Sequence, residues 1–481
     1  MARVETIVFL SLILDLFAFT IPLPLFPRLI EWYTLRESSE PNGLLSRTLR
    51  TVSSIRSLFY SSGVHSQKWD VVLLGGLIGS VFSTLQFFVS PKIGSLSDKY
   101  GRKRILLLTM IGNILSALVW IQSTSFASYM LSRVIGGLSE GNVQLAIAIL
   151  SDVTTPANRS KALAHVGIAF AICFCIGPPI GAYFASRPIP SSMNTWGMEY
   201  NIYAAPALLT LVLLVAETAF LAYALPETRG KAPKADEVTN GSANGKANGK
   251  ASATNGLAKP PVKKATVSER LRLLKTLRHF HFLFLSIFSG VEFTLTFLTF
   301  DLFDWNNKQN GALIGSIGIM SALLQGGYVR RATAKIGEGV MARRGVSSCT
   351  LGLALLALVP IYATSNLVLA TRFLQGAAVC MAFTSATVVN SLTAFASLQC
   401  DEGGFDSVTG KPVEEHPSLA KGKALGQFRS SGQLGRAMGP IIACAAYWTF
   451  GPAYTYTVSA VAMFALSAGM KRIAVKKTRK P

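Results

Sequence analysis

Long runs of apolar residues recur along the chain and constrain its fold more than any other feature. Each run approaches the length of about 20 residues that a helix needs to cross the hydrocarbon core of a bilayer. A membrane β-barrel is excluded, because its short strands alternate apolar and polar positions. The pattern predicts an all-α polytopic membrane protein with 12 transmembrane helices in two six-helix bundles. The expected helices lie at 6–30, 69–91, 104–122, 126–150, 160–186, 200–225, 280–303, 311–329, 347–364, 367–397, 423–449 and 452–472.

Composition agrees with this class, since charged residues make up 15% of the chain against about 25% in soluble domains. A polar stretch with the near-repeat NGSANGKANGK at 240–250 separates the two sets of runs and cannot bury enough apolar surface to order itself. The N-terminal run lacks a small-residue cleavage pattern, so we expect it to be the first span and not a removed signal peptide. The expected units are an N-terminal bundle 1–226 with an extracytoplasmic loop 31–68, a flexible basic cytoplasmic linker 227–278, a C-terminal bundle 279–472 and a basic cytoplasmic tail 473–481.

The chain carries 46 Lys and Arg residues against 24 Asp and Glu, a net charge of +22. The cations gather after alternate apolar runs and at the C-terminus, which is the pattern of cytoplasmic loops and excludes a nucleic-acid partner. Both termini are therefore expected in the cytoplasm. The cation-bearing loop 31–68 is an exception, but long loops are translocated with little regard to charge. We expect the linker and tail to contact the anionic inner leaflet, with 268–278 as a basic amphipathic helix on its surface.

The six cysteines show neither a disulfide framework nor metal-ligand spacing. No zinc-protease, calcium-loop or phosphate-loop motif is complete. We therefore expect no metal, no cofactor and no enzymatic activity.

The segment 94–103, GSLSDKYGRK, is the most specific motif in the chain. It matches the GxLxDxxGRK/R signature between spans 2 and 3 of the major facilitator superfamily, and it lies between the same two spans. The resemblance implies that superfamily's fold and its alternating-access transport. We expect this motif to act as a conformational gate, in which glycines permit a tight turn and charged groups latch helix ends together. The gate residues are Gly94, Asp98, Gly101, Arg102 and Lys103.

Other segments extend the resemblance over most of the chain. The segment LDLFAFTIPLPLFP at 14–27 is similar to the first span of tetracycline and multidrug proton antiporters. The segment GPPIG at 177–181 resembles the fifth span of the antiporter branch, where Gly177, Pro178 and Gly181 are expected to bend the helix and admit close packing. The combination looks most like the eukaryotic tetracycline-transporter-like proteins, a branch regarded as organic-anion transporters. The resemblance therefore implies a drug:proton antiporter type and small amphipathic solutes.

Ionisable side chains inside the predicted spans are the main candidates for function. Each costs about 2.5–3.5 kcal/mol at the bilayer centre on insertion scales, so it should face a cavity or a partner. A carboxyl in a low-dielectric cavity can gain and lose a proton near neutral pH. The predicted proton-coupling residues are Asp15, Glu140, Glu217 and Glu292.

Polar stripes on the predicted helices indicate cavity walls. In the fourth span Arg133 and Gln144 share one helical face with Glu140, and Arg133 lies about 10 Å from Glu140 along the axis, too far for direct pairing. Alternatively, the hydroxyls bond to their own helix and the charged groups serve packing between helices. The predicted substrate-binding residues are Arg133, Gln144, Ser289, Thr296, Gln325 and Arg372.

These observations predict a monomeric secondary active transporter that exchanges small amphipathic organic compounds, such as organic anions or drug-like molecules, for protons. The site is expected near the bilayer midplane between the bundles, opening to each side in turn. Two alternatives remain: a facilitative organic-anion uniporter and a non-transporting membrane scaffold. The membrane is expected to be the plasma membrane or an endomembrane.

Overall fold

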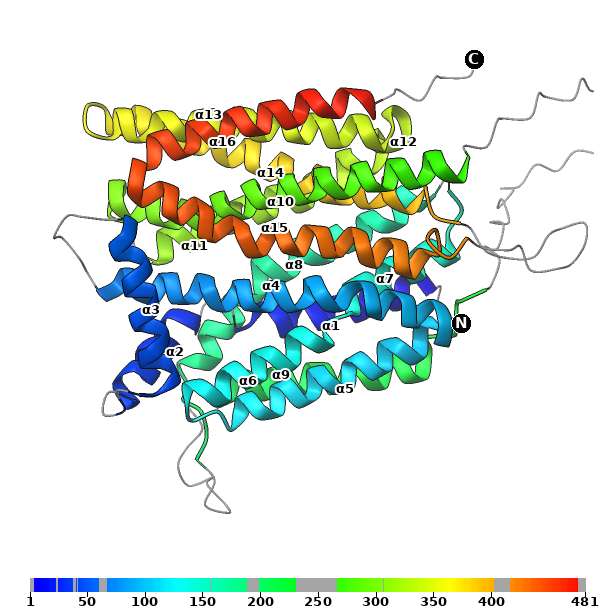
Figure 1. The fold of residues 1–481 in the computed structure, drawn as a ribbon, viewed down its shortest axis with the longest axis horizontal. Coiled ribbons are helices and arrows are strands. Elements are labelled where there is room, and N and C mark those ends of the chain that lie inside the picture. Colours follow the sequence, from blue (N-terminus) through cyan, green and yellow to red (C-terminus); the bar gives the residue numbers. More distant parts are fainter. Residues whose placement is uncertain are drawn as a thin grey trace, which may run out of the picture.

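The computed structural model describes residues 4–22, 25–37, 40, 42–59, 67–156, 158–187, 199–230, 266–305, 307–401 and 416–474. Within these residues every regular element is a helix, and most helices run along the longest axis of the molecule (Figure 1). The first and last described residues lie at the same end of the bundle (Figure 1). We call this the linker end, because the chain also leaves the first bundle and enters the second one there.

Residues up to 230 form nine helices in the part of this half that the structure describes. They are α1 (Val4–Thr20), α2 (Phe26–Arg36), α3 (Leu44–Phe59), α4 (Gln67–Tyr100), α5 (Arg102–Ile121), α6 (Phe126–Ser139), α7 (Asn142–Val153), α8 (Arg159–Ala185) and α9 (Ala204–Ala224). Helices α1 and α2 together make the first span, and α6 and α7 together make the fourth.

Residues from 266 form the second half. Its helices are α10 (Val267–Phe303), α11 (Asn307–Leu324), the π-helical turn η3 (Gln325–Val329), α12 (Arg330–Ile336), α13 (Glu338–Ala363), α14 (Leu367–Ser397), α15 (Lys421–Phe450), α16 (Pro452–Gly469) and the 3-10 turn η4 (Met470–Arg472). Helix α11, η3 and α12 follow one another without a break and make the eighth span.

Nine stretches of the described chain are long and apolar enough to cross a membrane by length and composition alone. The three remaining spans are α1 with α2, α4 and α15. Helices α4 and α15 pack against each other across the interface between the halves. Their more polar composition is compatible with a membrane because polar side chains can lie at that interface, whereas apolar side chains such as Phe88 and Ile442 are exposed.

Two predicted spans are interrupted. Proline lacks a backbone donor, and the chain between α1 and α2 contains Pro22 and Pro24. In the fourth span Glu140 is extended, with φ −68° and ψ 100°, between α6 and α7. The prediction of one continuous helical face from Arg133 to Gln144 is therefore wrong, because the extended residue resets the helical phase.

Each half has its own hydrophobic core. The N-terminal core includes Leu16, Met110 and Leu145, and the C-terminal core includes Leu298 and Leu353. The halves meet through α4 with α15 on one side and through α8 with α11 and α14 on the other. Two cores joined by such contacts are what two helical bundles require.

The predicted loop 31–68 contains regular structure, namely the end of α2 and all of α3. Tyr33 is fully buried, and its hydroxyl donates a 2.8 Å hydrogen bond to the backbone oxygen of Ser123. Helix α3 contacts α4 and α6 of the first half and α15 of the second, across the end opposite the linker end (Figure 1). Residues 60–66 lie outside the described residues.

The segment 268–278 is also different from the prediction, because α10 begins at Val267 and continues into the seventh span. Leu274 and Leu277 on this segment are buried in the C-terminal core. Arg270 forms a 2.8 Å ion pair with Asp401. The segment therefore packs as part of the second bundle and does not lie free on a membrane surface. The linker residues 231–265 and the tail residues 475–481 lie outside the described residues.

Candidate functional site

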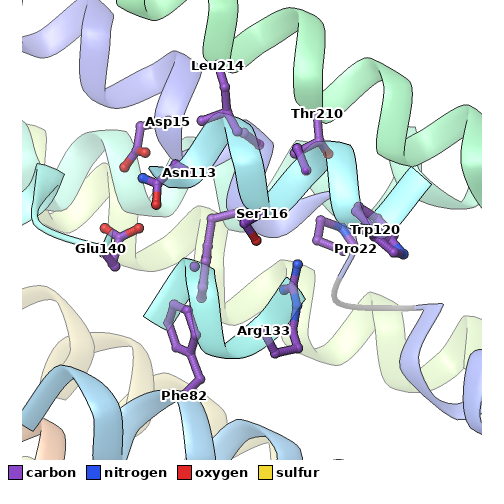
Figure 2. A pocket seen from close by; sticks show the side chains of 14 residues that line it. Asp15, Pro22, Phe82, Asn113, Ser116, Trp120, Arg133, Glu140, Thr210 and Leu214 are labelled. Atoms are coloured by element: carbon purple, nitrogen blue, oxygen red, sulfur yellow. The ribbon is translucent and has the colours of Figure 1, made fainter. Parts of the chain in front are cut away.

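Three side chains from separate helices meet in the middle of the first bundle: Asp15 of α1, Asn113 of α5 and Glu140 at the break between α6 and α7 (Figure 2). A fourth, Asn142 at the start of α7, donates a 2.5 Å hydrogen bond from its amide to Asp15. The break in the fourth span positions Glu140 and Asn142, because it brings both residues to the same region as Asp15. Two of the predicted proton-coupling acids are thus brought together.

Glu217 of α9 is also fully buried. The Ser11 hydroxyl donates a 2.7 Å hydrogen bond to its Oε1. Among the described residues no hydrogen-bond partner reaches its Oε2. Glu217 lies within electrostatic range of Asp15 and Glu140, so three of the four predicted acids form one cluster.

A cavity of about 60 Å³ is lined by residues of α1, α4, α5, α6 and α9, among them Asp15, Glu140 and Arg133. Every lining residue belongs to the first bundle, so this cavity lies within one half, and the substrate site between the halves stays a prediction. Its volume is enough for a few water molecules. Arg133 stacks over Trp120 and Tyr129, with its guanidinium carbon 5.7 Å and 5.5 Å from their ring centroids. Figure 2 shows Arg133 apart from the acids and close to Trp120.

Two arginines that the sequence analysis missed lie on α15 of the second bundle. Arg429 is within electrostatic range of Glu140 and Asp15 in the first bundle. Arg436 lies seven residues later on the same face and is within range of Glu292. Among the described residues no hydrogen bond to either guanidinium is present. Both occupy a predicted span, so the criterion that selected the four acids would have found them.

Glu292, the fourth predicted acid, lies in the second half of α10 in the second bundle. Its side chain and that of Arg436 are exposed, whereas Arg429 is half-buried. Arg436 is in electrostatic range of both Glu292 and Arg429, and Arg429 is in range of the acids of the first bundle, so charged groups of the two bundles are electrostatically linked.

The predicted substrate-binding residues are dispersed. Gln144 donates from its amide to the backbone oxygen of Ser90 on α4, at 2.8 Å. Ser289 and Thr296 bond to backbone oxygens of their own helix, at 2.6 and 3.2 Å, as the packing alternative proposed. Gln325 accepts a 3.1 Å hydrogen bond from Asn390. Gln144 and Gln325 are buried in helix contacts.

Arg372 lies in the first turns of α14 and is exposed. It does not line the cavity that contains Asp15, Glu140 and Arg133. The structure therefore does not bring Arg372 together with the acids, although its role remains a prediction.

The predicted gate motif joins the two bundles at the linker end. The Asp98 carboxylate accepts hydrogen bonds from the backbone N–H groups of Gly422 (2.9 Å) and Lys423 (2.7 Å), in the first turn of α15. Arg102 is fully buried and pairs with Asp98 and with Asp152, both at 2.8 Å. An anion at a helix N-terminus satisfies free backbone donors and complements the helix dipole. We call these contacts the latch.

Further contacts surround the latch, and of these only the one made by Lys421 joins the two bundles. Lys421 is buried and lies 3.4 Å from Asp152. Lys103 donates a 2.7 Å hydrogen bond to the backbone oxygen of Ala222. Glu227 accepts from the backbone N–H groups of Arg102 (2.8 Å) and Lys103 (3.1 Å), so it caps the N-terminus of α5. The sequence marked the motif residues but not these partners.

The two glycines of the motif act differently. Gly101 has a φ of +101° between α4 and α5, so it makes the predicted tight turn. Gly94 lies inside α4, and the prediction that it permits a turn is wrong. A Cβ at Gly94 would lie 2.0 Å from the backbone oxygen of Gly422. Gly94 is therefore a site of close approach between α4 and α15 at the linker end.

Gly177 and Gly181 admit close packing of α8 against the end of α1. A Cβ at Gly177 would lie 2.0 Å from Thr20 Oγ1, and one at Gly181 would lie 2.0 Å from the backbone oxygen of Ile21. Helix α8 continues through Pro178 without interruption. The packing role has structural support, and the predicted bend remains a prediction.

Comparison with known proteins places this architecture in a family. The family model described as Major Facilitator Superfamily matches residues 8–411. The chain belongs to the major facilitator superfamily. The predicted resemblance and the twelve-helix fold are confirmed, and membership indicates a transporter rather than an enzyme.

Relatives within the superfamily cover nearly the whole chain. Major facilitator superfamily domain-containing protein 10 from Mus musculus is 34% identical over 95% of this chain and 90% of its own length. The crystal structure of the human organic anion transporter MFSD10 (TETRAN) has a TM-score of 0.72 and 29% identity, covering 97% of this chain and 99% of that one. The class H tetracycline resistance protein from Pasteurella multocida is 34% identical, over 22% of this chain and 26% of its own length.

Proposed function

We propose that this superfamily member is a proton-coupled secondary transporter of small amphipathic organic anions that works by alternating access. One observation carries the proposal: Arg429 of the second bundle lies within electrostatic range of Asp15 and Glu140 of the first. Charges that meet across the boundary between two bundles respond when the bundles move. The human relative described as an organic anion transporter supports the substrate class.

The charge arrangement suggests how the acids and the substrate would interact. An anionic substrate needs a cation in the membrane interior, and Arg429 is half-buried with no hydrogen bond among the described residues. Ionised Asp15 and Glu140 compete with a substrate for the field of this cation. Substrate binding and protonation of the acids would then influence each other, which is the requirement for coupling.

Alternating access is supported by a difference between the linker end and the part of the molecule further from it. The latch closes the linker end through buried ion pairs. Further from that end, Glu292 and Arg436 are exposed. In this proposal the linker end faces the cytoplasm, and the structure represents the state that is open toward the opposite side.

The direction of coupling admits two candidates. Antiport with protons follows from the resemblance to drug:proton antiporters. The shared cation favours the second candidate, cotransport of the anion with a proton. A substrate that takes over Arg429 leaves Asp15 and Glu140 without their cation, and protonation of a carboxyl relieves the resulting repulsion between negative charges.

Flux measurements in proteoliposomes test the proposal. The purified chain is reconstituted, the membrane potential is clamped, and saturable uptake of fluorescein, an amphipathic organic anion, is followed with the interior acidic, the exterior acidic or no pH gradient. Faster uptake with an acidic interior supports antiport, and faster uptake with an acidic exterior supports cotransport. Saturable uptake that ignores the gradient would establish a facilitative uniporter. Uptake no greater than in protein-free vesicles would contradict transport of this substrate class.

A further inference from the structure

A cavity of about 680 Å³ lies at the linker end, lined by α10 and α15 of the second bundle and by Phe87 of α4 in the first. Helix α15 packs against both α10 and α4, and the three helices lie side by side on the viewed face (Figure 1). The cavity is separate from the acid cluster, because none of its lining residues lines the smaller cavity.

Large exposed apolar side chains lie next to the cavity lining on α4 and α10. Phe88 follows Phe87 along α4 and is 61% exposed, and Leu283 follows Phe282 along α10 and is 46% exposed. Large apolar side chains with this exposure in a membrane-spanning helix indicate contact with hydrocarbon. A ligand in the cavity would therefore be in exchange with lipid.

The lining combines basic and apolar side chains. Four basic side chains lie near the starts of α10 and α15, and no acidic side chain among the described residues lines the cavity. Apolar side chains line both the outer part, with Leu271 and Leu274, and the deeper part, where Ser430 and Ser431 also lie. The basic residues are Lys275, Arg278, His279 and Lys423, and the deeper apolar ones are Phe87, Phe282 and Leu434.

This combination of cations and apolar side chains fits one class of ligand, which has a negative head and an apolar tail. Positive side chains at the start of a span attract anionic headgroups. The Arg278 guanidinium is held by a 3.0 Å hydrogen bond to Gln427 of α15, so the polar part is built by both helices. A soluble phosphate would use the cations but would leave the apolar part unfilled.

The cavity is also connected to the latch. Lys423 lines the cavity, and its backbone N–H is the group that donates to Asp98. Phe87 belongs to the same helix as Asp98, so α4 closes the cavity wall only while it packs on α15. A ligand that contacts all three helices binds the closed linker end more tightly than the open one, and it shifts the conformational equilibrium by that difference in affinity.

We propose that this cavity binds an anionic phospholipid, with its phosphate on Lys275, Arg278 and Lys423 and an acyl chain along Phe87, Phe282 and Leu434, and that the bound lipid stabilises the closed linker end.

Native mass spectrometry of the detergent-purified full chain tests the binding site. Phosphatidylserine and phosphatidylcholine with identical acyl chains are titrated against the parent, Lys275→Gln/Lys423→Gln and the matched control Lys99→Gln/Arg272→Gln. The control removes the same charge from exposed positions at the linker end that do not line the cavity. We expect the parent and the control to bind the first phosphatidylserine about tenfold more tightly than phosphatidylcholine, and the test variant to lose that preference. Equal preference in all three proteins would overturn the site.

Two additional measurements test whether a soluble anion can occupy the site and whether misfolding explains a loss of binding. Millimolar inorganic phosphate is added to the lipid-bound parent, and displacement of phosphatidylserine would show that a soluble anion occupies the site, which contradicts the proposal. If the double variant fails to fold, the single variants Lys275→Gln and Lys423→Gln are titrated. Each is expected to lower the affinity for phosphatidylserine about threefold, and an unchanged affinity in both would refute the assignment.

The effect of the bound lipid on the latch is measured as the distance between two spin labels. Spin labels replace Arg104 on α5 and Lys335 on α12, which are exposed residues in different bundles. In nanodiscs that contain phosphatidylserine we expect a larger short-distance population than in phosphatidylcholine alone. Identical distance distributions in the two lipids would show that the bound lipid does not act on the latch.

Discussion

The carboxylate of Asp98 accepts a 2.7 Å hydrogen bond from the backbone N–H of Lys423, so a side chain of the first bundle caps a helix of the second. The first N–H groups of α15 have no partner within their own helix. Their positive end attracts the negative charge of Asp98. Because the two residues belong to different bundles, this contact exists only while the linker end is closed.

Replacing Asp98 with Ala should favour opening of the linker end. The substitution removes the cap of α15 and one partner of the buried Arg102, and the loss of a cap alone costs about 0.5–2 kcal/mol. Spin-label distances between residues 104 and 335 should show a larger long-distance population. Lys99→Ala, a neighbouring exposed position, serves as the control. Unchanged distances in Asp98→Ala would contradict a latch role for this residue.

The hydrogen bond between Ser11 and Glu217 should stabilise the fold, so that replacing the serine costs more than removing the charge of the acid. Ser11→Ala leaves a buried carboxyl without its 2.7 Å donor, and an unsatisfied buried polar group costs about 1–3 kcal/mol. Glu217→Gln keeps an oxygen that accepts from Ser11, so it should cost less. Thermal unfolding in detergent should give a lower Tm for Ser11→Ala than for Glu217→Gln. The reverse order would show that the hydrogen bond does not stabilise the fold.

Gly181→Ala should destabilise the first bundle. The new methyl group would lie 2.0 Å from a backbone oxygen of Ile21, which cannot move aside as a flexible side chain could. Overpacking of this kind costs about 1–3 kcal/mol. The matched control is Gly315→Ala on α11, where an added Cβ meets nothing within 4 Å. Yield of monodisperse protein and Tm are the measurements, and equal values for the two variants would argue against the close packing.

Arg429→Gln should weaken binding of an anionic substrate. A hydrogen bond to a charged group is worth about 1.5–3 kcal/mol, which corresponds to roughly a 10- to 100-fold loss of affinity. Arg429→Lys should recover part of it, because the charge remains but the bidentate geometry does not. Concentration dependence of fluorescein uptake provides the measurement, with Arg272→Gln as the control. Parent-like affinity in Arg429→Gln would remove this residue from the site.

The Cys400 thiol should be unreactive in the folded protein. Cys400 lies beyond the end of α14, and burial raises its pKa to about 12. At pH 8 the group is therefore a thiol, whereas the thiolate is the reactive form. Alkylation with a maleimide followed by peptide mass spectrometry should label Cys400 only after unfolding. Rapid labelling of the native protein at pH 8 would show that this region opens.

The fold was predictable to the level of spans because the length and apolarity of each run are local properties. The same reasoning located Asp98 and Arg102, since their motif is contiguous. It failed at Glu140, where one extended residue divides a run that composition alone presents as a single helix. It also failed for 31–68, whose polar composition concealed a helix that packs across the end of the bundle.

The candidate site was predicted only in part. Asp15, Glu140 and Glu217 were each selected as acids at membrane depth, but their convergence depends on how α1, α6 and α9 pack. Arg429 also lies in a predicted span, but its proximity to Asp15 and Glu140 depends on how α15 packs against the first bundle.

The sequence by itself determined that this protein spans a membrane with helices, where those helices lie, and which charged residues the membrane would force into the interior. These conclusions follow from the cost of placing polar groups in hydrocarbon, which depends on composition within a single run. Only the tertiary structure decided that Asp98 caps α15, that Arg429 is in range of Asp15 and Glu140, and that basic side chains of α10 and α15 share a cavity. The partners in these contacts are separated by long stretches of chain, and the packing of whole bundles brings them together.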